Sequence, residues 1–416
     1  PDPLYDEHMT GPLHGFRIID VTSMVSGPSA TMILADQGAD VIKVEKPDGG
    51  DQTRSSANTQ NGFSANFINN NRNKRSVALN LKDAVAKPAL LKLCEGADVF
   101  IQNFRPGVVD RMGIGEPDIR AVAPNIVYVS ISGFGATGPY AGKPVYDPLI
   151  QALSGLATVQ AGSDEERPRL VRTILPDKLT GIVAAQAITA ALLSRTRTGE
   201  GQHIHLSMLD AIIAFLWGSD MGSQTFIDSP FPQQKAASFV DLIYETADGH
   251  ISVAVQSNKE WEALSRAFEM PEFLEDARFK TPALRQENID SRLTLTQDIL
   301  RTRPASEWIT RLEAEDVPCA PVLTRTNMID HPQVVANGVV VEIDHHLAGG
   351  VRQARLAAQF SGTPAEHRRG GPALGEHTAE ILGGIGYTAD EIATLTGIET
   401  GHKTGHKTGI NKDAAE

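Results

Sequence analysis

The segment TILPDKLTGIVAAQAITAALLSR (173–195) places a carboxylate, Asp177, at the start of a long apolar run. An Asp at a helix N-cap accepts a backbone N–H and is stabilised by the helix dipole, so capping explains its position. The same helix end keeps a carboxylate ionised, and an ionised carboxylate can attack an activated acyl group. The two interpretations are compatible, and position alone does not separate them.

Basic side chains form a second group of residues that could take part in ligand binding. Lys43 and Lys46 flank the end of the second expected strand, and several of the others lie at or after strand ends. The others are Arg54, Arg72, Lys74, Arg75, Arg105 and Arg111. A solvated surface explains any one of them. Their recurrence at successive strand ends, in a chain of net charge −13, instead predicts an anionic ligand with several phosphates.

One glycine pattern is rejected as a cofactor motif. SGFGATGPY contains G-x-G-x-x-G at Gly133, Gly135 and Gly138. A dinucleotide fingerprint must open a helix, so that the pyrophosphate lies at the helix N-terminus. Pro139 and further turn residues follow instead, so we expect a tight turn and no nicotinamide or flavin enzyme.

Alternating strands and helices must position these groups. Strands are expected at 16–22, 40–47, 98–104 and 125–132, with helices at 28–39 and 83–97. This alternation predicts an α/β fold with a mostly parallel sheet covered on both faces, and with ligands beyond the carboxyl ends of the strands. A short strand (203–208) and a helix (209–216) follow the helix of Asp177.

The chain is long enough for two domains. We expect a large domain from 1–221 and 326–400, a smaller α+β domain at 222–325, and a flexible tail at 401–416. Two strand-like runs (239–255) around Asp248-Gly249, and amphipathic helices in NKEWEALSRAF and PASEWITRLEAE, indicate the smaller domain. The tail carries the repeat GHKTGHKTG, whose two histidines could bind metal, but disorder explains it better.

Composition excludes several classes of protein. The acidic net charge argues against a nucleic-acid binder. No stretch of 18 apolar residues appears, so no membrane span is expected. Cys94 and Cys319 lie far apart, which suits a reducing, cytoplasmic compartment and gives neither a disulfide framework nor a metal site.

Eight stretches in order, from about residue 11 to 396, together resemble the family III CoA-transferases, which include formyl-CoA transferase, the carnitine CoA-transferases and the bile-acid-inducible F family. They are GPLHGFRIIDVT, SGPSATMILADQGADVIKVEKPDGGDQTR, NRNKRSVALNLK, ADVFIQNFRPGVVDRMG, VYDPLIQALSGL, PDKLTGIVAAQAITAALLSRTRTGEGQHIHLSMLDA, HPQVVANG and LGEHTAEIL. The resemblance implies a Rossmann-like large domain built from both ends of the chain. It also implies an interlocked homodimer in which each site takes residues from the partner chain.

The resemblance further implies a CoA-transferase reaction between an acyl-CoA and a small carboxylic acid, with coenzyme A as substrate and no permanently bound cofactor. Asp177, in PDKLTG, matches the nucleophile. It would attack the thioester to give a mixed anhydride and then an aspartyl-CoA thioester, and the acceptor acid would reverse these steps.

The family's CoA-binding positions carry over to the strand ends and the following loops. The matching residues are Met24, Val25, Ser26, Lys46, Arg72, Lys74, Arg75, Asn103, Phe104, Val108, Arg111, Tyr146 and Met208. Core packing is the alternative for Phe104 and Met208. Arg169 and Arg172 could bind a second carboxylate, as in succinate, although surface arginines explain them as well.

Two departures from the family pattern bear on the substrate and the reaction. The region 218–238 lacks the glycine run of formyl-CoA transferase, which puts formate or oxalate specificity in doubt. The related 2-methylacyl-CoA racemases pair the Asp with a His, where this chain has Tyr146; His203 and His205 are better explained as strand residues. We therefore favour transferase over racemase. A non-catalytic CoA-binding protein would keep the basic groove without requiring Asp177.

Overall fold

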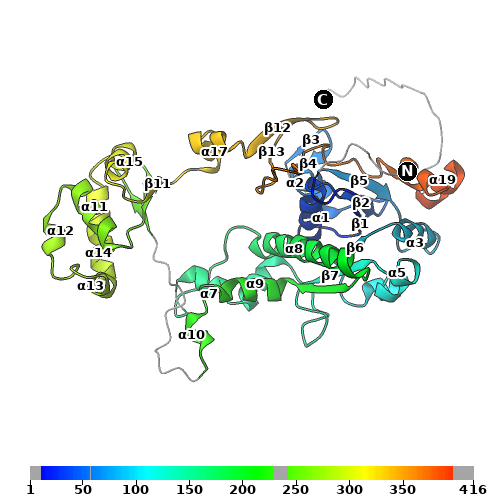
Figure 1. Ribbon diagram of the computed structural model, residues 1–416, viewed down its shortest axis with the longest axis horizontal. Helices are drawn as coiled ribbons and strands as arrows, with labels where there is room; N and C mark the ends of the chain where they lie inside the picture. The colour runs from blue at the N-terminus through cyan, green and yellow to red at the C-terminus, as the bar shows by residue number, and fades with distance from the viewer. Residues whose placement is uncertain (1–10, 57, 163, 228–241, 397–416) are drawn as a thin grey trace, which may run out of the picture. The chain divides into compact units, whose positions relative to one another are not determined.

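The computed structural model describes residues 11–56, 58–162, 164–227 and 242–396. The chain divides into two compact units, Pro1–Ala236 with Val339–Glu416, and Ala237–Gly338 (Figure 1). The second unit thus begins 15 residues after the boundary expected at 222 and ends 13 residues after the one expected at 325. The expected tail, 401–416 with its GHKT repeat, lies outside the described residues.

A six-stranded parallel sheet forms the centre of the first unit. Its strands, in spatial order, are β5 (Lys74–Ala78), β2 (Asp40–Glu45), β1 (Arg17–Asp20), β6 (Val99–Gln102), β7 (Val127–Ser132) and β8 (His203–Ser207). Every neighbouring pair is parallel. Counted along the chain within this sheet, the order is 3-2-1-4-5-6, the doubly wound order whose ligand crevice lies where the order reverses, outside β1 and β6. The prediction of a parallel sheet is confirmed.

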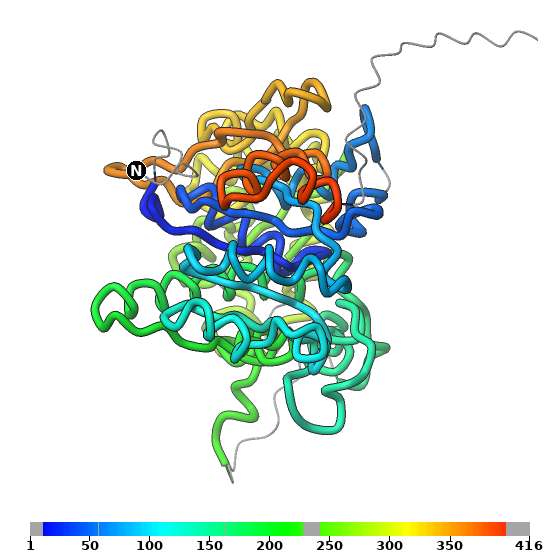
Figure 2. The backbone as a smooth tube through the Cα atoms, turned by 90° about the vertical axis from the view of Figure 1, so that its right-hand side faces the viewer, coloured from blue at the N-terminus to red at the C-terminus, as the bar shows by residue number. Residues whose placement is uncertain are grey.

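Helices cover both faces of the sheet because neighbouring strand residues point to opposite sides. Ile18, Val41 and Val99 pack with α1 (Ser26–Asp36) and α8 (Leu175–Thr198) on one face. The other face packs with α3 (Lys87–Glu95) and α5 (Glu116–Val122), and with α18 (Thr378–Gly384) and α19 (Ala389–Thr396) from the C-terminal part of the chain. Figure 2 shows these red C-terminal helices beside the blue N-terminal part.

The first unit also contains shorter helices and strands outside the six-stranded sheet and the helices named above. They are η1 (Gln52–Ser55), β3 (Thr59–Gln60), β4 (Phe63–Ser64), α2 (Ala65–Asn71), α4 (Val108–Met112), α6 (Asp147–Leu153), α7 (Leu156–Ala161), α9 (Met208–Trp217), α10 (Gly222–Thr225), β12 (Val340–His345) and β13 (Gly349–Ala354).

The second unit is an α+β arrangement with its own core. Antiparallel strands β9 (Ile243–Glu245), β10 (His250–Val253) and β11 (Cys319–Pro321) form its sheet, and β9 and β10 flank the expected Asp248-Gly249 turn. Trp261, Phe268 and Trp308 are buried in its core. The helices are α11 (Asn258–Phe268), α12 (Glu272–Glu275), α13 (Pro282–Glu287), α14 (Ile289–Leu300), α15 (Ala305–Ala314), α16 (Arg325–Ile329) and α17 (Pro332–Asn337).

Helix α8 is the longest helix in the described part of the chain, and it packs along α1 (Figure 1). It is also the one described helix long and apolar enough to meet a length-and-hydropathy test for a membrane span. Its residues Ala184, Ile188 and Ala191 are buried against the sheet, so packing accounts for the hydropathy of this face. At Gly181 the two helices approach so closely that a Cβ would overlap the Ser29 hydroxyl and lie 2.9 Å from the Ser26 carbonyl oxygen.

This contact predicts that Gly181→Ala destabilises the protein by about 1–3 kcal/mol, because overpacking forces the helices apart. Gly383→Ala is the matched control, since Gly383 is a helical glycine with open space around its Cβ position. Alanine should be neutral or slightly stabilising there. Urea unfolding of both variants measures the difference, and equal midpoints would contradict the close approach.

Candidate active site

Asp177 is the third residue of α8, after Pro176 in the first turn. The N-cap residue is Ile174, which makes no side-chain capping bond, so the interpretation of Asp177 as the helix cap is wrong. Instead, the backbone of Ser26, the first residue of α1, lies beside the Asp177 carboxyl and lowers its pKa. Asp177 therefore lies at the N-terminus of a neighbouring helix, where backbone amides and the helix dipole favour an anion.

Two opposing effects set the acidity of Asp177. Burial, followed by the charge of Asp147, raises the pKa of the Asp177 carboxyl to about 6, and the Ser26 N–H partly offsets both. At pH 7 the group is mostly ionised, yet it is more basic than an ordinary carboxylate. A carboxylate with these properties suits nucleophilic attack or proton transfer near neutral pH.

A groove of about 750 Å³ lies beyond the carboxyl ends of the first strands of the sheet. Lys46 and Phe104, both expected to bind a phosphate-bearing ligand, line it. Its walls include Val21, Thr22, Ser23, Val44, Glu45, Pro47, Asp48, Gly50, Asp51, Gln52, Leu79, Asn80, Leu81, Lys82, Asp83, Met112, Thr394, Leu395 and Thr396. Asp177 is not in this lining. The β1–α1 loop joins the two places, because Thr22 and Ser23 line the groove while Ser26 lies beside Asp177.

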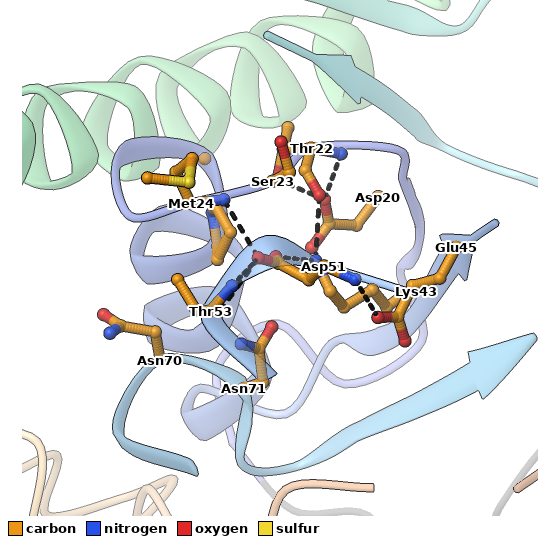
Figure 3. Close-up of polar contacts among 12 residues, drawn as sticks. Asp20, Thr22, Ser23, Met24, Lys43, Glu45, Asp51, Thr53, Asn70 and Asn71 are labelled. Atoms are coloured by element: carbon orange, nitrogen blue, oxygen red, sulfur yellow. Dashed lines mark hydrogen bonds and ion pairs between the residues drawn. The ribbon is translucent and has the colours of Figure 1, made fainter. Parts of the chain in front are cut away.

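Hydrogen bonds with Asn103, directly after β6, and with Asp51, the N-cap residue of η1, fix the β1–α1 loop. Asn103 accepts from the Ser23 N–H at 3.0 Å and donates to the Ser23 carbonyl at 2.8 Å. Asp51 accepts from the Met24 N–H at 3.2 Å, as Figure 3 shows. Met24 has a φ of 72°, a left-handed conformation that is uncommon for a side chain of this kind and is typical of functional loops.

Buried ion pairs lie beneath this loop. Lys43 is fully buried, pairs with Asp51 at 3.0 Å and donates to the Thr22 carbonyl at 2.8 Å. Lys74 pairs with Asp20, which also accepts from the Thr22 amide. Figure 3 shows several of these side chains converging under the loop. A buried charge is tolerated only when it is paired, so these contacts make the loop part of one interlocked network.

The same burial corrects part of the expected phosphate site. Arg72, Lys74 and Arg75 are buried, and they pair with Asp36, Asp20 and Asp40 respectively. Their placement does not fit contact with a ligand phosphate. Lys74 and Arg75 belong to strand β5, which the sequence analysis missed because a charged segment does not look like a buried strand.

The other candidate residues are spread around the strand ends. Val108 begins α4, and Arg111 is exposed in the same short helix. Tyr146 is 68% exposed at the N-cap of α6, whereas Met208 is buried among apolar side chains, so for Met208 the core-packing alternative fits. Val25 is buried directly before α1, and Arg169 and Arg172 are exposed before α8.

Two charged groups near the site, Asp147 and Lys82, are not predicted from the sequence pattern. Asp147, the carboxylate beside Asp177, lay unnoticed in the quoted stretch VYDP, next to Tyr146. Lys82 lines the groove after β5, and it was missed because that strand was missed. His203 bonds to Ser130 on the neighbouring strand at 2.9 Å, which agrees with its interpretation as a strand residue.

This geometry predicts a pH-dependent effect of Asp177→Asn on stability. A carboxyl with a raised folded-state pKa holds its proton more tightly when folded, so stability falls as pH rises from about 4 to about 6 and stays lower above. Removing the charge should stabilise the protein at pH 8 by up to about 2 kcal/mol, and by little at pH 4. Asp210→Asn is the control, because Asp210 is the exposed third residue of α9. Thermal unfolding is measured at both pH values; if Asp177→Asn gave no gain in stability at pH 8, the raised pKa of Asp177 would be contradicted.

The chain is similar in sequence to CoA-transferases over most of its length. The model of CoA-transferase family III matches residues 13–378. Human succinyl-CoA:glutarate CoA-transferase is 33% identical over 91% of this chain and 87% of its own length. Formyl-CoA:oxalate CoA-transferase of Shigella sonnei is 32% identical over 93% of this chain and 99% of its own. Succinate–glutarate CoA-transferase of Agrobacterium fabrum is 32% identical over 89% and 95%.

Solved structures agree with the fold. Rv3272 from M. tuberculosis superimposes with a TM-score of 0.79 at 30% identity, covering 90% of this chain and 100% of its own. A CAIB/BAIF family protein from Brucella suis gives a TM-score of 0.80 at 29% identity, with the same coverage.

Proposed function

The chain belongs to CoA-transferase family III, and from this premise we propose that Asp177 carries CoA between two organic acids as a covalent intermediate. The observation that carries the proposal is the carboxylate of Asp177 beside the backbone of Ser26, at one end of the loop that also borders the groove. An ionised, unusually basic carboxylate in this position has the properties of a nucleophile.

The proposed reaction balances without a further reagent. A carboxylate oxygen of Asp177 attacks the acyl-CoA carbonyl, the C–S bond breaks, and CoA thiolate leaves a mixed anhydride. The thiolate then attacks the Asp177 carbonyl, which releases the donor acid and leaves an aspartyl-CoA thioester. The acceptor carboxylate attacks this thioester to form a second anhydride, and the returning thiolate attacks the acceptor acyl carbon, so that Asp177 is regenerated.

The Ser26 amide supports the two steps in which the carbonyl carbon of Asp177 itself is attacked, by the thiolate and by the acceptor carboxylate. In these two steps negative charge develops on an oxygen of Asp177, and a fixed backbone N–H stabilises such charge. The backbone of Ser26 lies beside the Asp177 carboxyl, so its N–H would be close to an oxygen of that group as the charge changes. The Asn103 and Asp51 contacts to Ser23 and Met24 keep the amide fixed.

The groove at the strand ends fits the CoA part of the substrate. It lies at the edge where doubly wound sheets bind their ligands. Lys46 and Lys82 line it and provide cations for phosphate, and Phe104 provides an apolar contact. The loop from Ser23 to Ser26 would then lead the pantetheine arm toward Asp177.

For the exchanged acids we propose a dicarboxylate pair. Two of the relatives are named for succinate or succinyl-CoA with glutarate. Arg169 and Arg172 are exposed just before α8, and arginine binds carboxylates through two parallel N–H bonds. These side chains are candidates for the distal carboxylate of such an acid.

The racemase alternative has weaker support. A racemase needs a second acid/base group opposite the first. Asp147, whose charge acts on Asp177, is buried, and each of its oxygens already accepts a hydrogen bond. His203 is bonded to Ser130. These contacts leave the transferase as the better-supported reaction.

We further propose that a second copy of this chain covers the outer face of α8 in a cytoplasmic homodimer, as the family resemblance implies. An apolar groove of about 650 Å³ runs along this face, where Ile182 and Leu193 are exposed beside Phe16, Ile33 and Phe360. A helix that is apolar on both its inner and outer faces is normally buried on both. The free cysteines Cys94 and Cys319 fit the reducing compartment.

The covalent intermediate predicts trapping by hydroxylamine. Incubation with succinyl-CoA and hydroxylamine should convert Asp177 into a stable hydroxamate, because the reagent attacks an anhydride or thioester but not a carboxylate. Mass spectrometry of the digested protein locates the modification. Asp177→Asn is the control and should give none. Wild-type protein that stays unmodified across several acyl-CoA donors would contradict the mechanism, as would turnover by Asp177→Asn.

The groove predicts that Lys46→Ala and Lys82→Ala each raise the KM for acyl-CoA by roughly 3- to 10-fold, since each removes a cation that contacts phosphate. The value of kcat should change little. Lys259→Ala, an exposed lysine of the second unit, is the matched control. Steady-state kinetics measure the KM for acyl-CoA. If this KM were the same in all three variants, the phosphates would not bind at Lys46 and Lys82.

A further inference from the structure

Asp147 contacts the nucleophile's own backbone. It is the first residue of α6 and is 3% exposed. Its Oδ2 accepts from the Asp177 backbone N–H at 3.2 Å. This amide belongs to the first turn of α8, where helix N–H groups have no partner within their own helix. A buried side chain from another helix therefore satisfies the amide of Asp177.

Gln151 holds Asp147 in this position. It is 2% exposed, and its Nε2 donates to Asp147 Oδ1 at 2.7 Å. Its Oε1 accepts from the Val171 N–H at 2.9 Å. Gln151 thus connects α6 to the segment that runs directly into α8. The orientation of the Asp147 carboxylate is fixed, because one oxygen is bonded to Gln151 in α6 and the other to the Asp177 amide in α8.

The charge of Asp147 also faces Asp177. On the α1 side, Asp177 meets the uncharged Ser26 amide. On its own helix, the Lys178 Nζ is exposed and donates to Thr173. Asp147 is the charged group of the described residues that acts on the Asp177 carboxyl, and it adds to burial in raising that pKa. A nearby like charge makes a carboxylate more basic and thus more nucleophilic.

We infer that Asp147, clamped by Gln151, is a positioning residue for Asp177: it fixes the first turn of α8 through the Asp177 amide and sets the reactivity of the nucleophile through its charge. Asp147 touches no reacting atom in this role. The inference rests on the proposed function of Asp177 and extends it to a second carboxylate.

The pH profile of kcat/KM tests the inference. In the wild type the acid limb should lie near pH 6, the pKa of Asp177. Asp147→Asn keeps an oxygen for the Asp177 amide but removes the charge, so the limb should move to lower pH by roughly one unit, with kcat reduced. Asp147→Glu should restore the limb. Glu166→Gln removes an exposed charge from the segment before α8 and should leave the limb unchanged.

A second variant covers the case in which Asp147→Asn does not fold. Gln151→Met removes the clamp but keeps the Asp147 charge, and it should lower kcat several-fold with KM for acyl-CoA unchanged. An unmoved acid limb in folded Asp147→Asn, or wild-type kcat in Gln151→Met, would overturn the inference. Asp177→Asn separates this result from failure of the proposed function: turnover without Asp177 would overturn the function itself, whatever the pH profiles show.

Discussion

The position of the Asp177 carboxylate beside the Ser26 backbone depends on how closely α1 and α8 pack, and Gly181 allows that close approach. Both helices pack on one face of the parallel sheet. Asp177 therefore gains its properties from a neighbouring helix rather than from its own. Burial and Asp147 make the group more basic, and the amide keeps it ionised. A carboxylate that is both charged and basic at neutral pH follows from these three contacts together.

Buried charge holds the rest of the site in place. Lys43 and Lys74 lie under the β1–α1 loop, each paired with an acid and each fully buried. Removal of one partner from such a pair typically costs about 3–5 kcal/mol, because the other charge remains buried and uncompensated. The loop that borders the groove is thus tied to the core of the sheet. This arrangement lets Met24 keep a left-handed backbone conformation beside the groove.

Elements whose structure depends on the local sequence pattern were predicted correctly. Alternating apolar strands and helices predicted the parallel sheet, and the Asp248-Gly249 pair predicted the β9–β10 hairpin; both are confirmed. The pattern failed where partners come from distant segments. Lys74 and Arg75 appeared to be ligand-binding cations because the acids that neutralise them, Asp20 and Asp40, lie more than 30 residues away in the chain. Asp147 was overlooked for the same reason: its role depends on α8, not on its own helix.

Oxygen exchange into Asp177 tests the central claim most directly. Turnover with an acceptor acid labelled with ¹⁸O in its carboxylate, using an acid pair that the enzyme exchanges, transfers one acceptor oxygen to Asp177 each time the second anhydride is opened by CoA thiolate. Peptide mass spectrometry after turnover should find ¹⁸O in the peptide that contains Asp177, and the product thioester should keep one labelled oxygen. A protein that turns over and carries no label would show that the acceptor never bonds to Asp177, which would contradict the account.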